Sequence, residues 1–111
     1  PRTAHSQFVG GMTMGISAAL HEEGVIDPRF GHVVGADLAG YHIASHADIQ
    51  DIQAMWIDEF DPYFGPTGAK GIGEVGIVGV PAAISNAIYQ ATGLRLRDLP
   101  FTPDKVLMAT S

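Results

Sequence analysis

Two glycine-rich segments constrain the fold of this chain more than any other feature of its sequence. Residues 10–15 include three glycines, and residues 68–79 include five. Glycine lets the backbone approach a neighbouring segment or a ligand closely, although it weakens a helix by roughly 0.5–1 kcal/mol relative to alanine. The sequence therefore predicts close packing or close ligand approach at both segments.

The composition suits one small domain and excludes several classes of function. Charged residues make up 16% of the 111 residues, against about 25% in typical domains. Glycine and proline explain part of this deficit, and coverage by other protein would explain the rest. A formal charge of −6 without a basic cluster argues against binding to nucleic acid or anionic lipid. No apolar run approaches the roughly 18 residues of a membrane span.

The absence of cysteine limits the redox chemistry of the chain itself. Without a thiol, these residues form no disulfide and ligate no iron–sulfur cluster through thiolates.

Apolar periodicity predicts three helices. Spacings of three and four between apolar residues predict the first helix over 6–23. Pro81 and Gly93 are typical of the first residue of a helix and of the position just past its end. Thr102, followed by proline and aspartate, predicts the start of a short third helix. We expect residues 1–111 to form a single domain without internal repeats.

Turn residues and alternation predict a small sheet. The turn at 27–31 lies between Val25-Ile26 and residues 32–34, which predicts a hairpin. Residues 36–51 and 61–68 are predicted to be loops. Residues 52–57 alternate and are predicted to form a strand, with Ile52, Ala54 and Trp56 on one face. The expected fold class is α/β of the α+β kind, with helices packed on a small mixed or antiparallel sheet.

One glutamate, Glu74, lies within the second glycine-rich segment. Its apolar neighbours Ile72, Val75 and Ile77 can desolvate it, which disfavours the charged form of the carboxylate. A desolvated acid in a loop that approaches a ligand has the properties of a general base. The residues alone leave open the alternative that Glu74 accepts backbone N–H bonds and braces the loop.

Residues 71–76 also match the pattern G-x-G-x-x-G. A Rossmann dinucleotide site needs a strand directly before this pattern, and residues 61–69 are not typical of one. Lys70 is followed by glycine and not by serine or threonine, so a Walker loop has even less support.

His42 and His46 are four residues apart, with Asp48 nearby. Two histidines at this spacing can share a metal when they lie on a helix. Nothing else in residues 36–51 predicts a helix, and no third ligand is obvious. We therefore predict a solvated loop and no metal ligands.

Five motifs follow one another along the chain. They are Gln7-Phe8-Val9-Gly10-Gly11, Asp37-Leu38-Ala39-Gly40-Tyr41-His42, Gly68-Ala69-Lys70-Gly71-Ile72-Gly73-Glu74, the segment Val80 to Ile88, and the segment Leu96 to Leu107. In this order and spacing they resemble the C-terminal segment of the molybdenum-binding (molybdopterin) subunit of the xanthine dehydrogenase/aldehyde oxidase family. That family hydroxylates aldehydes or N-heterocycles with oxygen derived from water.

The resemblance implies roles for particular residues. A glutamate in the family's K-G-x-G-E motif removes the proton from the attacking oxygen, and Glu74 occupies that position. The residues that precede this glutamate line the molybdopterin, which implicates Lys70, Gly71, Ile72 and Gly73.

Further cofactor contacts follow from the N-terminal motif. The family's glutamine before x-x-G-G touches the cofactor, and Gln7 matches it. Arg2 and Thr3 fall at the end of an upstream cofactor-binding stretch. Many relatives have glutamine or tryptophan at the position of Met14.

The resemblance also implies cofactors and partners. In the full-length enzyme we expect molybdopterin, in its cytosine dinucleotide form, with iron–sulfur and FAD centres on other domains or subunits. The expected partners are the remainder of the molybdenum subunit, the iron–sulfur and flavin subunits, and a small aldehyde or heterocycle substrate. The expected compartment is the cytoplasm, with the periplasm as the alternative.

The chain by itself holds only part of such an active site. We expect the isolated 111 residues to be inactive, to bind no molybdenum, and to form a homodimer through exposed apolar surface. Two rival hypotheses remain. One is a stand-alone interaction or scaffold domain that keeps the fold without the cofactor, and the other is a nucleotide-binding module that uses the glycine loop.

Overall fold

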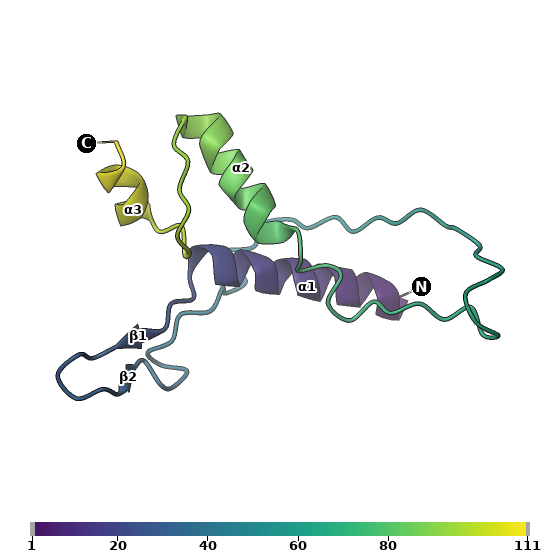
Figure 1. Ribbon diagram of the computed structural model, residues 1–111, viewed down its shortest axis with the longest axis horizontal. Coiled ribbons are helices and arrows are strands. Elements are labelled where there is room, and N and C mark those ends of the chain that lie inside the picture. Colours follow the sequence, from purple (N-terminus) through teal and green to yellow (C-terminus); the bar gives the residue numbers. More distant parts are fainter. Residues whose placement is uncertain (1, 111) are drawn as a thin grey trace.

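The computed structural model describes residues 2–110, which form three helices and one two-stranded sheet (Figure 1). The helices are α1 (Arg2–Leu20), α2 (Val80–Thr92) and α3 (Pro103–Met108). Strands β1 (Val25–Ile26) and β2 (Val33–Val34) pair in the antiparallel sense. The predicted α+β class with a small antiparallel sheet is confirmed. In residues 2–110 the helices pack on each other, through α1 and α2, and not on the two strands.

The hairpin lies where the sequence predicts it. Val25 pairs with Val34, and Ile26 pairs with Val33. The turn between them is held by Asp27, whose carboxylate accepts hydrogen bonds from the Arg29 side chain and backbone N–H. These donors lower the pKa of Asp27 below its ordinary value, because they stabilise the charged carboxylate.

The helix ends also agree with the sequence. Pro81 lies in the first turn of α2, and Gly93 ends the helix in a left-handed conformation with φ of 76°. The N–H of Gly93 donates to the carbonyl of Tyr89, which satisfies one of the free carbonyls of the last turn. Thr102 precedes the first residue of α3. Helix α1 begins four residues before the predicted start and ends three residues before the predicted end, and its glycines do not interrupt it.

Helices α1 and α2 touch through a glycine face. A Cβ atom built on Gly15 would lie 2.5 Å from the Cβ of Val80. A Cβ built on Gly11 would lie 3.1 Å from the backbone of Gly76, just before α2. A methyl group would clash at Gly15 and would crowd the backbone at Gly11, so the close packing predicted for residues 10–15 is confirmed.

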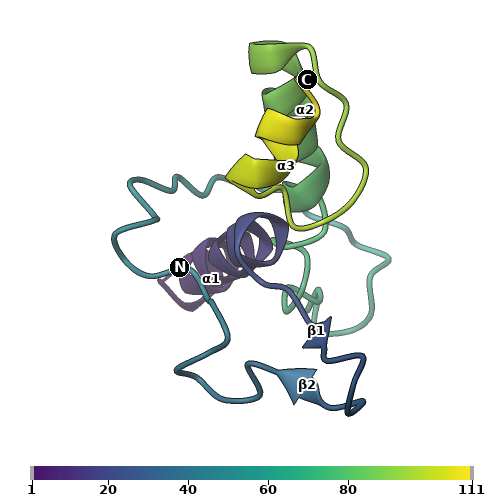
Figure 2. The same cartoon turned by 90° about the vertical axis from the view of Figure 1, so that its left-hand side faces the viewer.

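The C-terminal half of α1 anchors two other segments. The N–H of Phe101 donates to the carbonyl of Ala19 at 2.7 Å, and the N–H of Ala44 donates to the hydroxyl of Ser17 at 2.9 Å. Ala19 is fully buried and Phe101 is 7% exposed. Figure 2, viewed along α1, shows α2 and α3 on one side of this helix and the hairpin on the other.

Many large apolar side chains in residues 2–110 are exposed. The radius of gyration is 17.8 Å, whereas about 13 Å is typical of a compact domain of this length. The accessible surface is 8710 Å², against roughly 5900 Å² for a monomer of 11.7 kDa. No residue of α2 is buried. None of the described helices is long and apolar enough to span a membrane.

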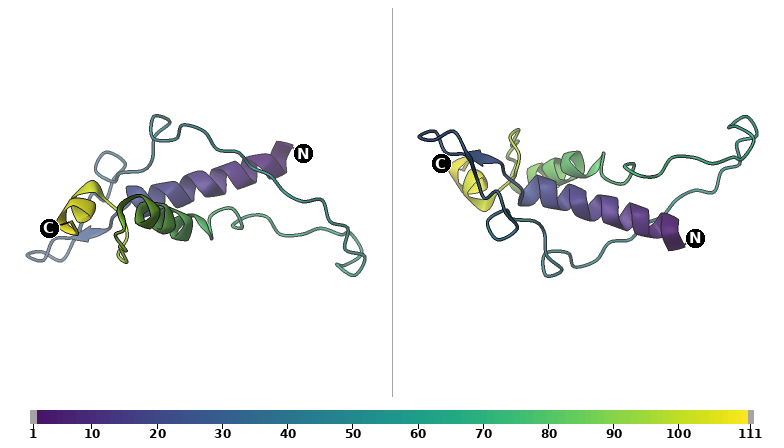
Figure 3. Two further views of the ribbon diagram at one scale, coloured as in Figure 1. Left: turned by 90° about the horizontal axis from the view of Figure 1, so that it is seen from above. Right: turned by 90° about the horizontal axis from the view of Figure 1, so that it is seen from below.

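The predicted strand over residues 52–57 is wrong. This segment is extended but hydrogen-bonds to no neighbouring strand, and it continues into an arm that reaches beyond the start of α1 (Figures 1 and 3). A β-strand needs a neighbouring strand with which its backbone forms hydrogen bonds, and the described residues do not supply one. The predicted shared face of Ile52, Ala54 and Trp56 is nevertheless present. Ile52 and Ala54 are half-buried, and the Trp56 ring stacks on Phe8 with 5.9 Å between centroids.

The uncovered surface predicts the behaviour of the chain by itself. We expect the isolated 111 residues to self-associate, because apolar side chains such as Ile57 (93% exposed) and Phe60 (89% exposed) would otherwise face water. Light scattering at several concentrations measures the effect as a molar mass that rises with concentration. A molar mass of 11.7 kDa at every concentration would contradict this expectation.

Candidate functional site

The predicted base, Glu74, lies in a series of turns that leads into α2. Residues 73–79 form these turns, in which the N–H of Ile77 donates to the carbonyl of Glu74 at 3.1 Å. Gly76 presses against α1, since a Cβ built there would lie 2.9 Å from the carbonyl oxygen of Phe8. The position of Glu74 is therefore set by a backbone contact two residues further along.

The same contact brings the N-terminal motif to this turn. Gln7 directly precedes Phe8, whose carbonyl oxygen faces Gly76. The turn of α1 that carries Gln7 therefore adjoins the turn that carries Glu74. Thr3 is four residues before Gln7 and shares its face of α1. Arg2 is six residues before Phe8, which places it about 9 Å from Phe8 along the axis of α1. Of the predicted cofactor contacts on α1, it is the most distant from Phe8. All three side chains are exposed.

Residues 70–73 present backbone donors to open space. Within residues 2–110, no backbone N–H from 69 to 76 donates a hydrogen bond. A Cβ built on Gly71 or Gly73 would meet nothing within 4 Å. The Lys70 ammonium lies over the Phe64 ring, 5.8 Å from its centroid. Free N–H groups along an open glycine loop suit the acceptor atoms of a pterin or a phosphate, so these residues fit the predicted cofactor.

The apolar pocket predicted around Glu74 is not formed by residues 2–110. Glu74 is exposed and Val75 is 55% exposed, while Ile72 and Ile77 are half-buried. The contacts of this turn run to α1 through Gly76, and the Glu74 and Val75 side chains lie on its exposed side. The Glu74 carboxylate has no hydrogen bond or ion pair with the described residues, and the loop-bracing alternative therefore lacks a contact that would support it.

The histidine pair lies in a loop, as the sequence predicts. Asp48 is engaged locally, because its carboxylate accepts hydrogen bonds from the backbone N–H and the hydroxyl of Ser45, both at 2.8 Å. These bonds lower the pKa of Asp48. Across residues 2–110, no three histidine, cysteine or acidic side chains are grouped so as to hold a metal.

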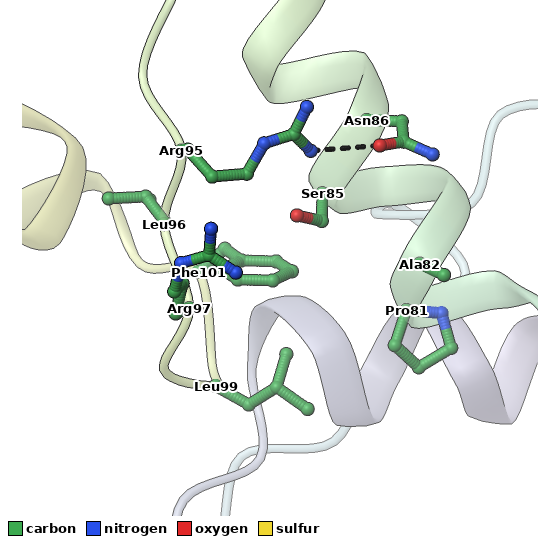
Figure 4. Close-up of a pocket in the computed structure, with 9 residues that line it drawn as sticks. All are labelled: Pro81, Ala82, Ser85, Asn86, Arg95, Leu96, Arg97, Leu99 and Phe101. Carbon is green, nitrogen blue, oxygen red and sulfur yellow. Dashed lines mark hydrogen bonds between the residues drawn. The ribbon is translucent and has the colours of Figure 1, made fainter.

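A second polar cluster, which the sequence analysis did not single out, lies between α2 and residues 94–101 (Figure 4). Arg95 and Arg97 approach Ser85 and Asn86 of α2 across a hollow of about 350 Å³. We call this hollow the arginine bay. The signal that could have revealed it is the alternation of leucine and arginine over Leu94-Arg95-Leu96-Arg97.

Comparison with known proteins finds relatives among molybdenum-binding subunits. Residues 1–50 match the family described as "Molybdopterin cofactor-binding domain". The molybdenum-binding subunit PaoC of the aldehyde oxidoreductase of Escherichia coli (strain K12) is 52% identical over 107 residues, which cover 96% of this chain and 15% of that subunit. The xanthine dehydrogenase molybdenum-binding subunit of Escherichia coli O157:H7 is 37% identical over 106 residues, covering 96% of this chain and 14% of the subunit.

A solved structure agrees with these relatives. Quinoline 2-oxidoreductase from Pseudomonas putida 86 superposes with a TM-score of 0.85 at 28% identity, over 98% of this chain and 14% of that one. The chain thus spans about one seventh of the length of the relatives it matches. It is homologous to the molybdenum-binding subunits of aldehyde oxidoreductase and xanthine dehydrogenase, which are oxidoreductases that bind a molybdenum cofactor.

Proposed function

We propose that these residues form the C-terminal part of the molybdenum-binding subunit of a hydroxylase that oxidises aldehydes or N-heterocycles with oxygen from water. The observation that carries the proposal is the contact of Gly76 with α1, which sets the turn of Gln7 beside the turn of Glu74. Two motifs far apart in the sequence, each with a predicted cofactor or catalytic role, thereby adjoin. The identity of 52% to a subunit named for aldehyde oxidoreduction supports the same function.

The cofactor would lie along the free backbone of residues 70–73. Their N–H groups are available to acceptor atoms, and the Gln7 amide offers both a donor and an acceptor. Thr3 and Arg2, further along α1, would meet the phosphates of a cytosine dinucleotide form. When bound, the molybdenum cofactor supplies the redox chemistry and activates the oxygen that enters the product.

Glu74 would act as the general base that takes the proton from the attacking oxygen. Its carboxylate has no hydrogen bond or ion pair with residues 2–110, so it is available to a reacting group. The surface that desolvates it would come from polypeptide outside these residues, since the described residues cover only one side of the turn. A base in this role contributes about 10²- to 10⁴-fold in rate.

The uncovered surface supports the expected partners. The bare arm at residues 50–67, and the side of α2 that faces away from residues 94–97, would be covered by the remainder of the molybdenum subunit. Iron–sulfur centres would belong to other domains or subunits, because this chain has no cysteine to ligate them. We place the flavin on other domains or subunits as well. The relatives are themselves named as subunits, which supports assembly with further chains.

Elemental analysis of the full-length polypeptide tests the proposed function. We expect bound molybdenum together with oxidation of aldehydes or N-heterocycles, and product oxygen that carries the label of isotopically labelled water. A full-length polypeptide without molybdenum would instead favour the non-catalytic scaffold hypothesis. Saturable binding of a nucleotide without molybdenum would favour the nucleotide-binding module.

A substitution at Gln7 tests the cofactor contact. We expect Gln7→Ala in the full-length polypeptide to weaken cofactor retention about two- to tenfold, because a hydrogen bond contributes about 0.5–1.5 kcal/mol. Molybdenum per polypeptide after extended dialysis measures the loss. Gln90→Ala, an exposed glutamine of α2, is the matched control and should retain wild-type molybdenum. Equal molybdenum in Gln7→Ala and wild type would remove Gln7 from the site.

A further inference from the structure

The arginine bay arises from the extended conformation of residues 94–97. Side chains alternate between two faces of an extended segment, so Leu94 and Leu96 are half-buried while Arg95 and Arg97 are exposed. Figure 4 shows both guanidinium groups on the side that faces α2, near Ser85 and Asn86. Pro81, Leu99 and Phe101 form an apolar floor below them.

The bay concentrates positive charge in an acidic chain. The sequence has 6 basic residues (lysine and arginine) against 12 acidic ones, and two of those six line this hollow. No aspartate or glutamate lines it. Two neighbouring guanidinium groups repel each other, and an anion held between them would offset this repulsion.

Arg95 is held in place before any ligand arrives. Its guanidinium carbon lies 4.0 Å from the centroid of the Tyr89 ring, and its Nη1 donates to the Asn86 side-chain oxygen at 2.8 Å. These two contacts restrict the side chain and leave its other N–H groups as donors. Arg97 has no hydrogen bond or ion pair with another described residue, so its whole donor fork is available.

We propose that the arginine bay is a docking site for a carboxylate side chain, aspartate or glutamate, on an extended segment of a partner polypeptide. Guanidinium forks match the geometry of a carboxylate, and charge complementarity favours an acidic partner. The apolar floor at Pro81, Leu99 and Phe101 suits an apolar side chain next to that carboxylate in the partner. A free phosphate ion would leave this floor unused. The proposal rests on this geometry and not on the function proposed for Glu74.

Peptide titration of the full-length polypeptide tests the proposal. The probe is a blocked tetrapeptide, acetyl-Leu-Glu-Glu-Leu-amide, and the control is the same peptide with glutamine in place of glutamate. We expect the glutamate peptide to bind and the double variant Arg95→Gln/Arg97→Gln to weaken it at least about tenfold, since hydrogen bonds to charged groups are among the stronger ones. Isothermal titration calorimetry measures both affinities.

Arg29→Gln is the control for loss of a guanidinium outside the bay, because it removes one positive charge from the hairpin, where Arg29 is paired with Asp27. This variant should bind the glutamate peptide as the wild type does. Equal binding of the two peptides, no binding of the glutamate peptide, or an equal loss in Arg29→Gln would each overturn the proposal. Displacement of the peptide by inorganic phosphate at equimolar concentration would also overturn it, in favour of a free-anion site.

Discussion

Replacing Glu74 by glutamine in the full-length enzyme should lower kcat by about 10²- to 10⁴-fold, which is the usual contribution of a general base. Glutamine keeps the size and shape of the side chain but cannot accept the proton. The molybdenum content should stay at the wild-type level, because the backbone N–H groups of residues 70–73 are unchanged. Steady-state kinetics and elemental analysis on the same preparation separate these two effects.

The control for this substitution is Glu59→Gln in the exposed arm, which removes an exposed carboxylate from a position without a proposed role. It should leave kcat within about twofold of the wild type, because the arm has no proposed part in the proton transfer. If Glu74→Gln retained more than about a tenth of the wild-type kcat, Glu74 would not be the base. Loss of molybdenum from Glu74→Gln would instead point to a structural role.

The substitution Gly15→Ala should destabilise the full-length protein by about 1–3 kcal/mol, the usual cost of forcing extra atoms into a packed interface. The added methyl group would lie 2.5 Å from Cβ of Val80 and 2.9 Å from both of its γ carbons. This clash outweighs the helix propensity that alanine gains over glycine, about 0.5–1 kcal/mol. The shift in the denaturant midpoint of unfolding measures this change. It is monitored by a spectroscopic signal that reports on this part of the protein.

Gly10→Ala makes the same chemical change in the same helix without the clash. A Cβ built on Gly10 meets nothing within 4 Å, so helix propensity alone should act and stabilise the protein by about 0.5–1 kcal/mol. Opposite signs for the two substitutions would establish the glycine contact between α1 and α2. Stabilisation by both would show that Gly15 is not packed against Val80 in solution.

Local residue chemistry was enough to predict most of the secondary structure. Pro81 and Gly93 marked the ends of α2, because proline suits a first helical turn and glycine accepts the left-handed conformation that follows the last turn. The hairpin at β1 and β2 followed from the turn residues between them. These features depend on the φ and ψ preferences of a few neighbouring residues, which the sequence states directly.

Residues 52–57 show where local pattern stops being sufficient. The alternation correctly predicted a shared face, since Ile52 and Ala54 are half-buried and Trp56 stacks on Phe8. It could not predict that the segment lacks a neighbouring strand among residues 2–110, because pairing depends on distant parts of a polypeptide. The desolvation predicted for Glu74 failed for the same reason, since its apolar neighbours do not close around it without further surface.

The sequence by itself determined the helices, the hairpin, and the glutamate and glycine residues of the candidate site. Only the tertiary structure decided what those glycines touch: Gly15 meets Val80, and Gly76 meets the carbonyl of Phe8, which sets the Gln7 and Glu74 turns beside each other. It also placed Arg95 and Arg97 opposite α2. The physical reason is that propensities and caps act over a few residues, whereas a contact between backbones depends on how segments far apart in the sequence pack together.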